Sequence, residues 1–488
     1  MRGTTRRDLL VVPVLALEPN NVSRENSRPG APDWQLTRVR LDKPGAYRSS
    51  RIEGYCSHQS IEAGETLRIM LSANPARRAS AEIFRMGYYG GKGARLVQTF
   101  GPVSCKPQPE PPIEDRRLRQ CQWEPSLELK IPGNWPSGVY LGRLNTVPES
   151  RNEPVWQSYV IFVVRDRRKA DVLFQVSDNT WAAYNRWPDN YSLYTDPRHP
   201  WAPDVAASFD RPYAKYPQIF EQPNSAGSGE FLLWEYPLYY WLEREGYDVT
   251  YVSNSDLLRP EEPLRARVFL SVGHDEYWDR RQYDNALGSV KSGTTHLYLS
   301  GNSVFGVTPF EPSASGQPNR VITRRGVYGG VYGGLDQFFK YPFSQEGPSA
   351  RDLMGAHTVW PFNGGGDWIC TRPNHWAFAG TGMKKGDAVP GLIGWEFHGD
   401  PAPKEGLEVL AAGTALRGGD DPADWTATIY PGPKGNFVFN AATIFWSQAL
   451  SAPPGHMLPW SHWSRPHGPD ARIERITHNL LRKALSTK

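Results

Sequence analysis

The first third of the chain alternates short apolar and polar runs, which is typical of β-strands with one buried face. Between Trp34 and Asp166 these runs are separated by Gly, Pro and Asn, and no segment shows the helical period. Strands at this spacing predict a β-sandwich of immunoglobulin-like type, which we assign to residues 30–166. The predicted strands are Thr66–Ser72, Ser80–Met86, Ser126–Ile131, Gly138–Arg143 and Trp156–Val164.

A charged connector, Arg165–Lys169, separates this region from a segment in which strand-like and helix-like patterns alternate. Such alternation predicts an α/β domain with a parallel, doubly wound sheet, which we place at residues 170–486. Gly- and Pro-rich insertions with irregular periodicity are expected at residues 305–427. The predicted strands are Ala170–Ser177, Asp248–Val252, Arg267–Val272, His296–Ser300 and Asn436–Asn440, and the predicted helices are Glu230–Glu245, Asp279–Ser292 and Ile473–Leu485.

The composition narrows the function classes. Charged residues make up 22% of the chain and hydrophobic residues 39%, as in a soluble globular protein. The 55 basic and 51 acidic residues nearly balance and form no basic cluster, which argues against nucleic acid as a partner. No Gly-x-Gly-x-x-Gly follows the first strand of the α/β domain, so dinucleotide binding has no support. No segment approaches the ~20 apolar residues of a membrane-spanning helix, and we expect no membrane span.

Residues 1–20 resemble a twin-arginine export leader. Arg6 and Arg7 precede the apolar stretch Val11–Leu17, but no small-x-small cleavage motif follows. The pattern predicts an exported, periplasmic protein, while an uncleaved leader and a cytoplasmic location stay open. If the protein is exported, a disulfide between Cys105 and Cys121, which flank a Pro-rich loop, is expected.

The strongest candidate for chemistry is the segment Gly273–Trp278, of sequence GHDEYW, which directly follows the predicted strand Arg267–Val272. Ligands of open α/β sheets bind at the carboxyl ends of strands. His274 and Glu276 at such a position combine a metal ligand with a proton carrier. A helix start, with Asp275 or Asp279 as the N-cap and Glu276 in an acid-favouring first turn, would account for the same residues.

The loop after the first strand of the domain, Asn179–Asp196, reaches the same edge of the sheet and is rich in tyrosine. Phenolate and carboxylate oxygens are hard donors, so two tyrosinates and one carboxylate would suit a mononuclear ferric ion. The residues alone also admit zinc or manganese. A bound metal would activate water and polarise a carbonyl group.

Several tracts resemble the large, or beta, subunit of N,N-dimethylformamidase and its relatives, and the resemblance covers most of the chain. It implies an immunoglobulin-like domain followed by a Rossmann-like, amidotransferase-type α/β domain, and mononuclear iron held by two tyrosines and one glutamate for formamide hydrolysis. It also implies a small partner subunit. The tracts are NTWAAYN, YSLYTD, SFDRPY, GHDEYW, SGNS, EIFRMGYYGGKGARLV, IPGNWPSGVYLGRL and FVFNAATIFWSQAL.

Carried over residue by residue, the resemblance makes Tyr184, Tyr194 and Glu276 the metal ligands. It makes His274 the nearby histidine, which acts as a base or orients a ligand. The interval between the two tyrosines is shorter here than in the family, so Tyr191 or Tyr213 could replace Tyr194.

Asn302, after the next strand, could donate a hydrogen bond to an oxyanion or cap a turn. We therefore predict a metal-dependent hydrolase of a non-peptide C–N bond, an amide or formamide, acting on a small-molecule amide. The alternatives are an exported carbohydrate-binding protein that uses Trp-rich loops, and an iron-tyrosinate enzyme of different chemistry on the same scaffold. A homo-oligomer stays open.

Overall fold

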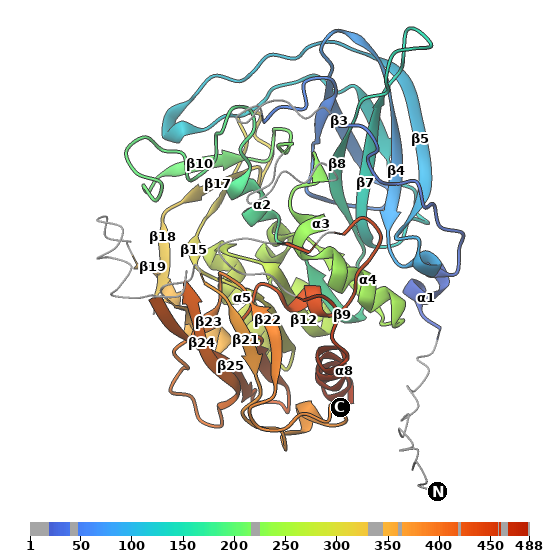
Figure 1. Cartoon of the computed structure of the whole chain (residues 1–488). Coiled ribbons are helices and arrows are strands. Elements are labelled where there is room, and N and C mark those ends of the chain that lie inside the picture. The colour runs from blue at the N-terminus through green and yellow to red at the C-terminus, as the bar shows by residue number, and fades with distance from the viewer. Residues whose placement is uncertain are drawn as a thin grey trace, which may run out of the picture.

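The computed structural model describes residues 19–39, 47–215, 225–329, 345–359, 364–417, 421–456, 458–459 and 467–486. The protein is a mixed, β-rich structure with several sheets and few helices (Figure 1). The predicted leader lies almost wholly outside the described residues. None of the helices in the described part of the chain is long and apolar enough to cross a membrane.

The N-terminal region forms two sheets that share one hydrophobic core, and their strand pairs are antiparallel except for the parallel pair β2–β8. All five strands predicted here are present, and the range Thr66–Ser72 is reproduced to the residue. In β6, buried and exposed residues alternate, so one face of this strand packs inward. The first sheet has the order β1 (Glu53–Cys56), β3 (Thr66–Ser72), β6 (Leu127–Lys130), and the second has the order β2 (Ser60–Glu62), β8 (Gln157–Arg165), β7 (Gly138–Thr146), β4 (Arg77–Met86), β5 (Ala94–Cys105).

A seven-stranded sheet forms the centre of the second region, with the order β11-β9-β12-β14-β26-β25-β24. Its first five strands are parallel, and β25 and β24 add an antiparallel hairpin at one edge. The strand bounds are β9 (Ala170–Gln175), β11 (Val249–Val252), β12 (Ala266–His274), β14 (Thr295–Gly301), β24 (Glu408–Arg417), β25 (Asp421–Pro431) and β26 (Phe437–Asn440).

Helices cover both faces of this sheet. Val172 and Phe174 of β9 belong to one hydrophobic cluster with residues of α3, α4 and α8, whereas Leu173 between them packs in a second cluster with α5 and α7. Because the parallel strands follow the spatial order second, first, third, fourth, fifth, the connections diverge between β9 and β12, where ligands bind in open sheets. The helix bounds are α1 (Asn21–Asn26), α2 (Asp178–Tyr184), α3 (Phe231–Trp234), α4 (Tyr236–Arg244), α5 (Arg280–Ser292), α7 (Ala350–Met354) and α8 (Ala471–Ser486).

The predicted helix Glu230–Glu245 is divided into α3 and α4, with Pro237 in the first turn of α4. Proline is tolerated there because its missing N–H group would be unpaired anyway. A fully buried ion pair between Arg85 of β4 and Glu243 of α4 joins the two regions, with Nη2 2.7 Å from Oε1. The two regions therefore share a packed boundary.

The described part of residues 305–427 contains more strands than its irregular sequence suggests. Besides the β24–β25 hairpin they contribute to four small sheets, of order β10-β17-β16, β13-β15-β18-β19, β20-β23 and β21-β22. Their bounds are β10 (Val205–Ser208), β13 (Tyr277–Trp278), β15 (Gly306–Val307), β16 (Phe310–Glu311), β17 (Val321–Arg324), β18 (Gly326–Gly329), β19 (Gln345–Ser349), β20 (His357–Thr358), β21 (Gly366–Ile369), β22 (Ala388–Ile393) and β23 (His398–Gly399).

The four cysteines are free and buried, so the expected disulfide between Cys105 and Cys121 is absent. The two residues lie apart because Cys105 ends β5, while Cys121 packs in a separate cluster with Trp123 and Trp187.

Candidate metal centre

The candidate site begins where β12 ends. Gly273 has φ of +67°, and a Cβ atom there would lie 2.6 Å from Cβ of Trp234 in α3, so only glycine fits this close approach. His274 follows and is fully buried, as are Asp275 and Glu276. The helix α5 starts only at Arg280, with Asp279 as its N-cap. The helix-start interpretation therefore accounts for Asp279 but not for Glu276.

Two tyrosine hydroxyls converge on the carboxylate of Glu276. Tyr184 Oη donates to Oε2 at 2.7 Å, and Tyr194 Oη lies 3.0 Å from Oε1 and 2.7 Å from Tyr184 Oη. The two rings stack with centroids 4.4 Å apart. A third hydroxyl, that of Tyr277, is hydrogen-bonded to Tyr194 Oη. Four oxygen-bearing side chains thus meet at one point.

Local structure brings the tyrosines there. Tyr184 is the last residue of α2, the short helix that follows β9, and the chain then loops back so that Leu193 N donates to Ala183 O at 3.0 Å. This contact sets Tyr194 beside Tyr184. The backbone N–H of Glu276 donates to Thr180 Oγ1 at 3.0 Å, which attaches α2 to the end of β12.

The two alternative tyrosines lie elsewhere. Tyr191 packs its ring against the guanidinium groups of Arg117 and Arg119, at 4.5 and 4.7 Å. Tyr213 places its ring against Trp181, with centroids 6.3 Å apart. The structure therefore brings Tyr194, rather than Tyr191 or Tyr213, to the carboxylate of Glu276.

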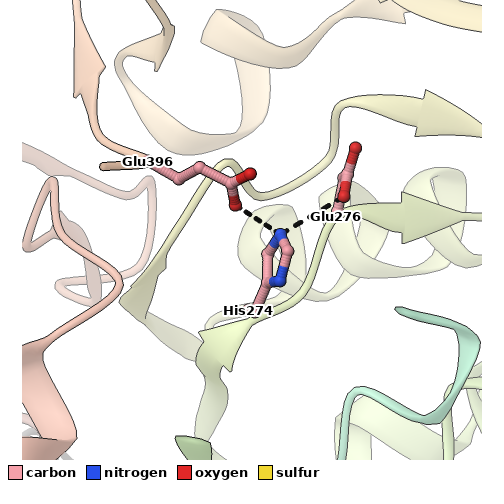
Figure 2. Close-up of side chains that lie close together, drawn as sticks. All are labelled: His274, Glu276 and Glu396. Atoms are coloured by element: carbon pink, nitrogen blue, oxygen red, sulfur yellow. Dashed lines mark ion pairs between the residues drawn. The ribbon is translucent and has the colours of Figure 1, made fainter. Parts of the chain in front are cut away.

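His274 lies between two carboxylates (Figure 2). Its Nε2 is 3.2 Å from Glu276 Oε2 and forms an ion pair with Glu396. Glu396 precedes β23 and arrives because Gly301 at the end of β14 has no side chain: a Cβ atom there would lie 2.1 Å from Glu396 O and 2.5 Å from Ile444 N.

The charges of the site act on its titratable groups. Burial lowers the pKa of His274, but the carboxylates of Glu396 and Glu276 outweigh it and raise the pKa well above 6.5. Burial and the charge of Glu276 raise the pKa of Tyr184 and of Tyr194 well above 10. The tyrosines would lose their protons near neutral pH only with a cation close to their oxygens.

Asn302 follows β14, whose Gly301 is paired with His274 of β12. It has φ of +49°, and its Oδ1 accepts a hydrogen bond from Thr358 Oγ1 at 2.7 Å. The next residue, Ser303, is held by its N–H, which donates to His398 Nε2 at 2.9 Å. Asn302 thus follows the strand next to β12, and its Oδ1 is engaged by Thr358.

Glu396 and Tyr277 were not identified from the sequence. Glu396 lies 120 positions beyond Glu276 in a segment without ligand spacing, and only the close approach at Gly301 reveals it. Tyr277 is part of GHDEYW itself, and its position directly after Glu276 could have indicated that it belongs to the site.

The donor set fits a hard cation. The oxygens of Tyr184, Tyr194 and Glu276 lie within 3.0 Å of one another along their hydrogen bonds, and all are ligands that ferric iron prefers. The ligand atoms of His274, Glu276 and Glu396 also lie within 4.8 Å of one another, which gives a second, mixed nitrogen and oxygen set. Glu276 belongs to both sets.

Comparison with known proteins adds one broad match. A family model described as N,N-dimethylformamidase beta subunit-like, C-terminal, matches residues 80–459, more than half of the chain. No curated protein matches the chain. One solved structure, from work on glycolipid glycan hydrolysis by a family 123 glycoside hydrolase from Clostridium perfringens, has 12% identity, covers 26% of this chain and 27% of its own, and gives a TM-score of 0.12. That likeness is too slight to bear on fold or function.

Proposed function

Because the chain belongs to the N,N-dimethylformamidase beta subunit-like family, we propose that it is an iron-dependent hydrolase of a small amide or formamide. The observation that carries this proposal is the meeting of two tyrosine hydroxyls, one carboxylate and a buried His–Glu pair at the carboxyl end of β12. This is the edge of the sheet at which ligands bind in open α/β folds.

Tyr184, Tyr194 and Glu276 would hold the metal. Bound ferric iron would polarise the amide carbonyl and lower the pKa of water. The three side chains would supply three negative charges, which favour a trivalent ion such as ferric iron over divalent zinc or divalent manganese. The stacking of the two rings and the bond from Glu276 N to Thr180 hold these oxygens in place before a metal arrives.

His274 and Glu396 would move the proton. Amide hydrolysis adds water across the C–N bond: one proton leaves the attacking water, and the amine nitrogen takes up a proton as the bond breaks. With a cation bound beside it, the imidazole of His274 would start neutral, accept the first proton as an imidazolium that Glu396 stabilises, and deliver that proton to the nitrogen. Asn302 would donate its side-chain amide to the oxyanion, since Thr358 already occupies its Oδ1.

The cavity beside the site is very small. Tyr184 lines it together with Trp181, Asn185, Tyr213, Ala214, Gly229 and Glu230, and its volume is about 10 Å³. This is about the space that one water molecule needs. The proposed substrate class, a small amide, therefore rests on the family match and not on the size of this cavity.

The tryptophans give the carbohydrate-binding alternative little support. Nine of the 18 are almost fully buried, and no Trp is among the exposed large hydrophobic residues of the described chain. A glycan-binding face would need such rings at the surface. An iron-tyrosinate enzyme of different chemistry would use the same ligands, and a substrate screen separates it from the amidase.

Three further features belong to the proposal. The two shared-core sheets and the parallel sheet support an immunoglobulin-like domain followed by a Rossmann-like domain. The family description names a beta subunit, which supports a small partner subunit, and light scattering of the purified chain would show whether it assembles alone. The Arg6-Arg7 pattern supports export, which cell fractionation would test.

The test is a metal analysis with a visible absorption spectrum of the purified protein and of Tyr184→Phe and Tyr194→Phe. We expect near one iron per chain and a tyrosinate-to-iron charge-transfer band that both variants weaken. Tyr191→Phe is the matched control, because Tyr191 Oη has no hydrogen-bond partner among the described residues and should leave the band unchanged.

Hydrolysis of N,N-dimethylformamide and related small amides is then measured by the amount of amine released. A protein that takes up no iron would refute the proposal. If the protein binds iron but shows no tyrosinate band, and His274→Ala and Glu396→Gln lose that iron, the metal would instead be held by the mixed set of His274, Glu276 and Glu396.

A further inference from the structure

Arg324, at the end of β17, is a buried cation beside the tyrosine cluster. It is 2% exposed, and in the part of the chain that the structure describes it forms no ion pair with a carboxylate. Its Nε and Nη2 donate to the backbone carbonyls of Pro200 and Ala202, the shortest at 2.6 Å. A buried charge without a counter-ion is costly, so its surroundings should contain compensating groups.

The compensating groups are the aromatic residues of the site. The guanidinium carbon lies 5.6 Å from the ring centroid of Tyr194 and 5.8 Å from that of Trp201, within cation–π range. The Nη1 atom has no partner of full hydrogen-bond geometry among the described residues. The side chain of Arg324 also lies near Tyr277: burial and the charge of Glu276 raise the pKa of Tyr277, and Arg324 lowers it, both as a charge and as a hydrogen-bond donor.

A second buried arginine shows what a purely structural role looks like. Arg211 is 3% exposed and also lacks a carboxylate partner in the described chain, but all three of its nitrogens donate to backbone carbonyls, those of Ser208, Trp187, Tyr191 and Ala182. Arg324 satisfies only two nitrogens in this way. Its third nitrogen, Nη1, is buried without such a partner among the described residues.

The chemistry of the three groups decides which one donates and which one accepts in hydrogen bonds between Arg324, Tyr277 and Tyr194. Arginine can only donate hydrogen bonds, and a tyrosine that binds a metal through its deprotonated oxygen can only accept them. For the hydroxyl of Tyr277 to link the two, it would accept a hydrogen bond from Arg324 and donate one to Tyr194. We infer that Arg324 and Tyr277 are positioning residues that act on Tyr194, holding its oxygen and lowering the energy of its electrons. This inference rests on the proposed iron-tyrosinate site.

The expected signature is spectroscopic. A positive charge and a hydrogen-bond donor near a tyrosinate stabilise its filled orbital, so more energy is needed to transfer an electron to the metal. Removing either one should shift the charge-transfer band to longer wavelength. A residue that only supports the fold would change the amount of iron-loaded protein but not the position of its band.

The experiment compares the visible spectra of iron-loaded wild type, Arg324→Gln, Tyr277→Phe and the double variant. We expect a shift to longer wavelength in both single variants and a double-variant shift smaller than their sum, because Arg324 acts partly through Tyr277. Arg324→Lys keeps the charge and should remain closer to wild type. Arg325→Gln, which changes the exposed neighbour, is the matched control and should leave the band in place.

Unshifted bands in Arg324→Gln and Tyr277→Phe would overturn the inference while leaving the proposed function intact. If Arg324→Gln does not fold, Tyr277→Phe and Arg324→Lys decide the question, and an unshifted Tyr277→Phe overturns it. A wild-type protein that shows no tyrosinate band would refute the proposed function and this inference together.

Discussion

The contact between Gly301 and Glu396 allows a sharp test of how the site is assembled, through the substitution Gly301→Ala. A Cβ atom at this position would lie 2.1 Å from Glu396 O and 2.5 Å from Ile444 N. Ordinary contacts of a Cβ atom begin at 3.4 Å, so the Glu396 backbone must move by more than 1 Å. Glu396 would then lose its present contact with His274, whereas the oxygens of Tyr184, Tyr194 and Glu276 lie on other segments.

The magnitude follows from this displacement. A misplacement of about 1 Å in a catalytic group can lower the rate roughly 100-fold. The strain of an added methyl group in a packed region should reduce the free energy of unfolding by about 1–3 kcal/mol. We therefore expect Gly301→Ala to fold, to keep its iron and its charge-transfer band, and to lose about two orders of magnitude in kcat.

The assay measures amine release, iron content and urea unfolding for Gly301→Ala and Glu396→Gln, which should lose activity to a similar extent. Gly288→Ala is the matched control, because Gly288 lies in α5 with no atom near its added Cβ. It should keep full activity and gain up to about 1 kcal/mol in stability. Wild-type kcat in Gly301→Ala would refute the role given to the close approach and to Glu396.

Two further outcomes are expected. Glu243→Gln leaves Arg85 buried without its counter-ion and should lower the free energy of unfolding by about 3–5 kcal/mol in chemical denaturation; a loss below 1 kcal/mol would contradict this account of the boundary. Burial lowers the pKa of His398 to about 4, so the unfolded chain, with a histidine pKa of about 6.5, takes up the proton first. Stability should therefore fall as the pH decreases from about 6.5 to 4, by up to about 3 kcal/mol from this group, and His398→Gln should flatten that slope in urea titrations across the range.

The sequence predicted the central strands well because these strands are buried on both faces. Short continuous apolar runs such as Arg267–Val272 are typical of strands covered on both sides, and β12 contains that run. The helix α5 was predicted from its N-cap, and Asp279 does accept the N–H of Arg281. The family resemblance is likewise confirmed by the match to residues 80–459.

The β24–β25 hairpin was not predicted. The strand β24 contains mostly small residues, and Gly413 and Ala415 within it give little β-strand signal. Its place is decided by packing, since Trp425 of β25 is fully buried against this strand pair. Tertiary contacts of this kind, like the contact between Glu396 and His274, produce no periodic pattern in the sequence.

The three residues after Gly273 differ in their contacts: His274 and Glu276 face the site, and Asp275 is bonded to the ends of neighbouring strands. The carboxyl group of Asp275 accepts hydrogen bonds from Gln175 of β9 at 2.7 Å, from Asn254 at 3.1 Å and from Ser271 of β12 at 2.8 Å. Burial raises the pKa of Asp275 to about 6 against these bonds. Asp275 thus ties two strand ends together, while its neighbours on either side turn to the site. A change at Asp275 should therefore displace both His274 and Glu276, although the carboxyl group of Asp275 is itself bonded to Gln175, Asn254 and Ser271.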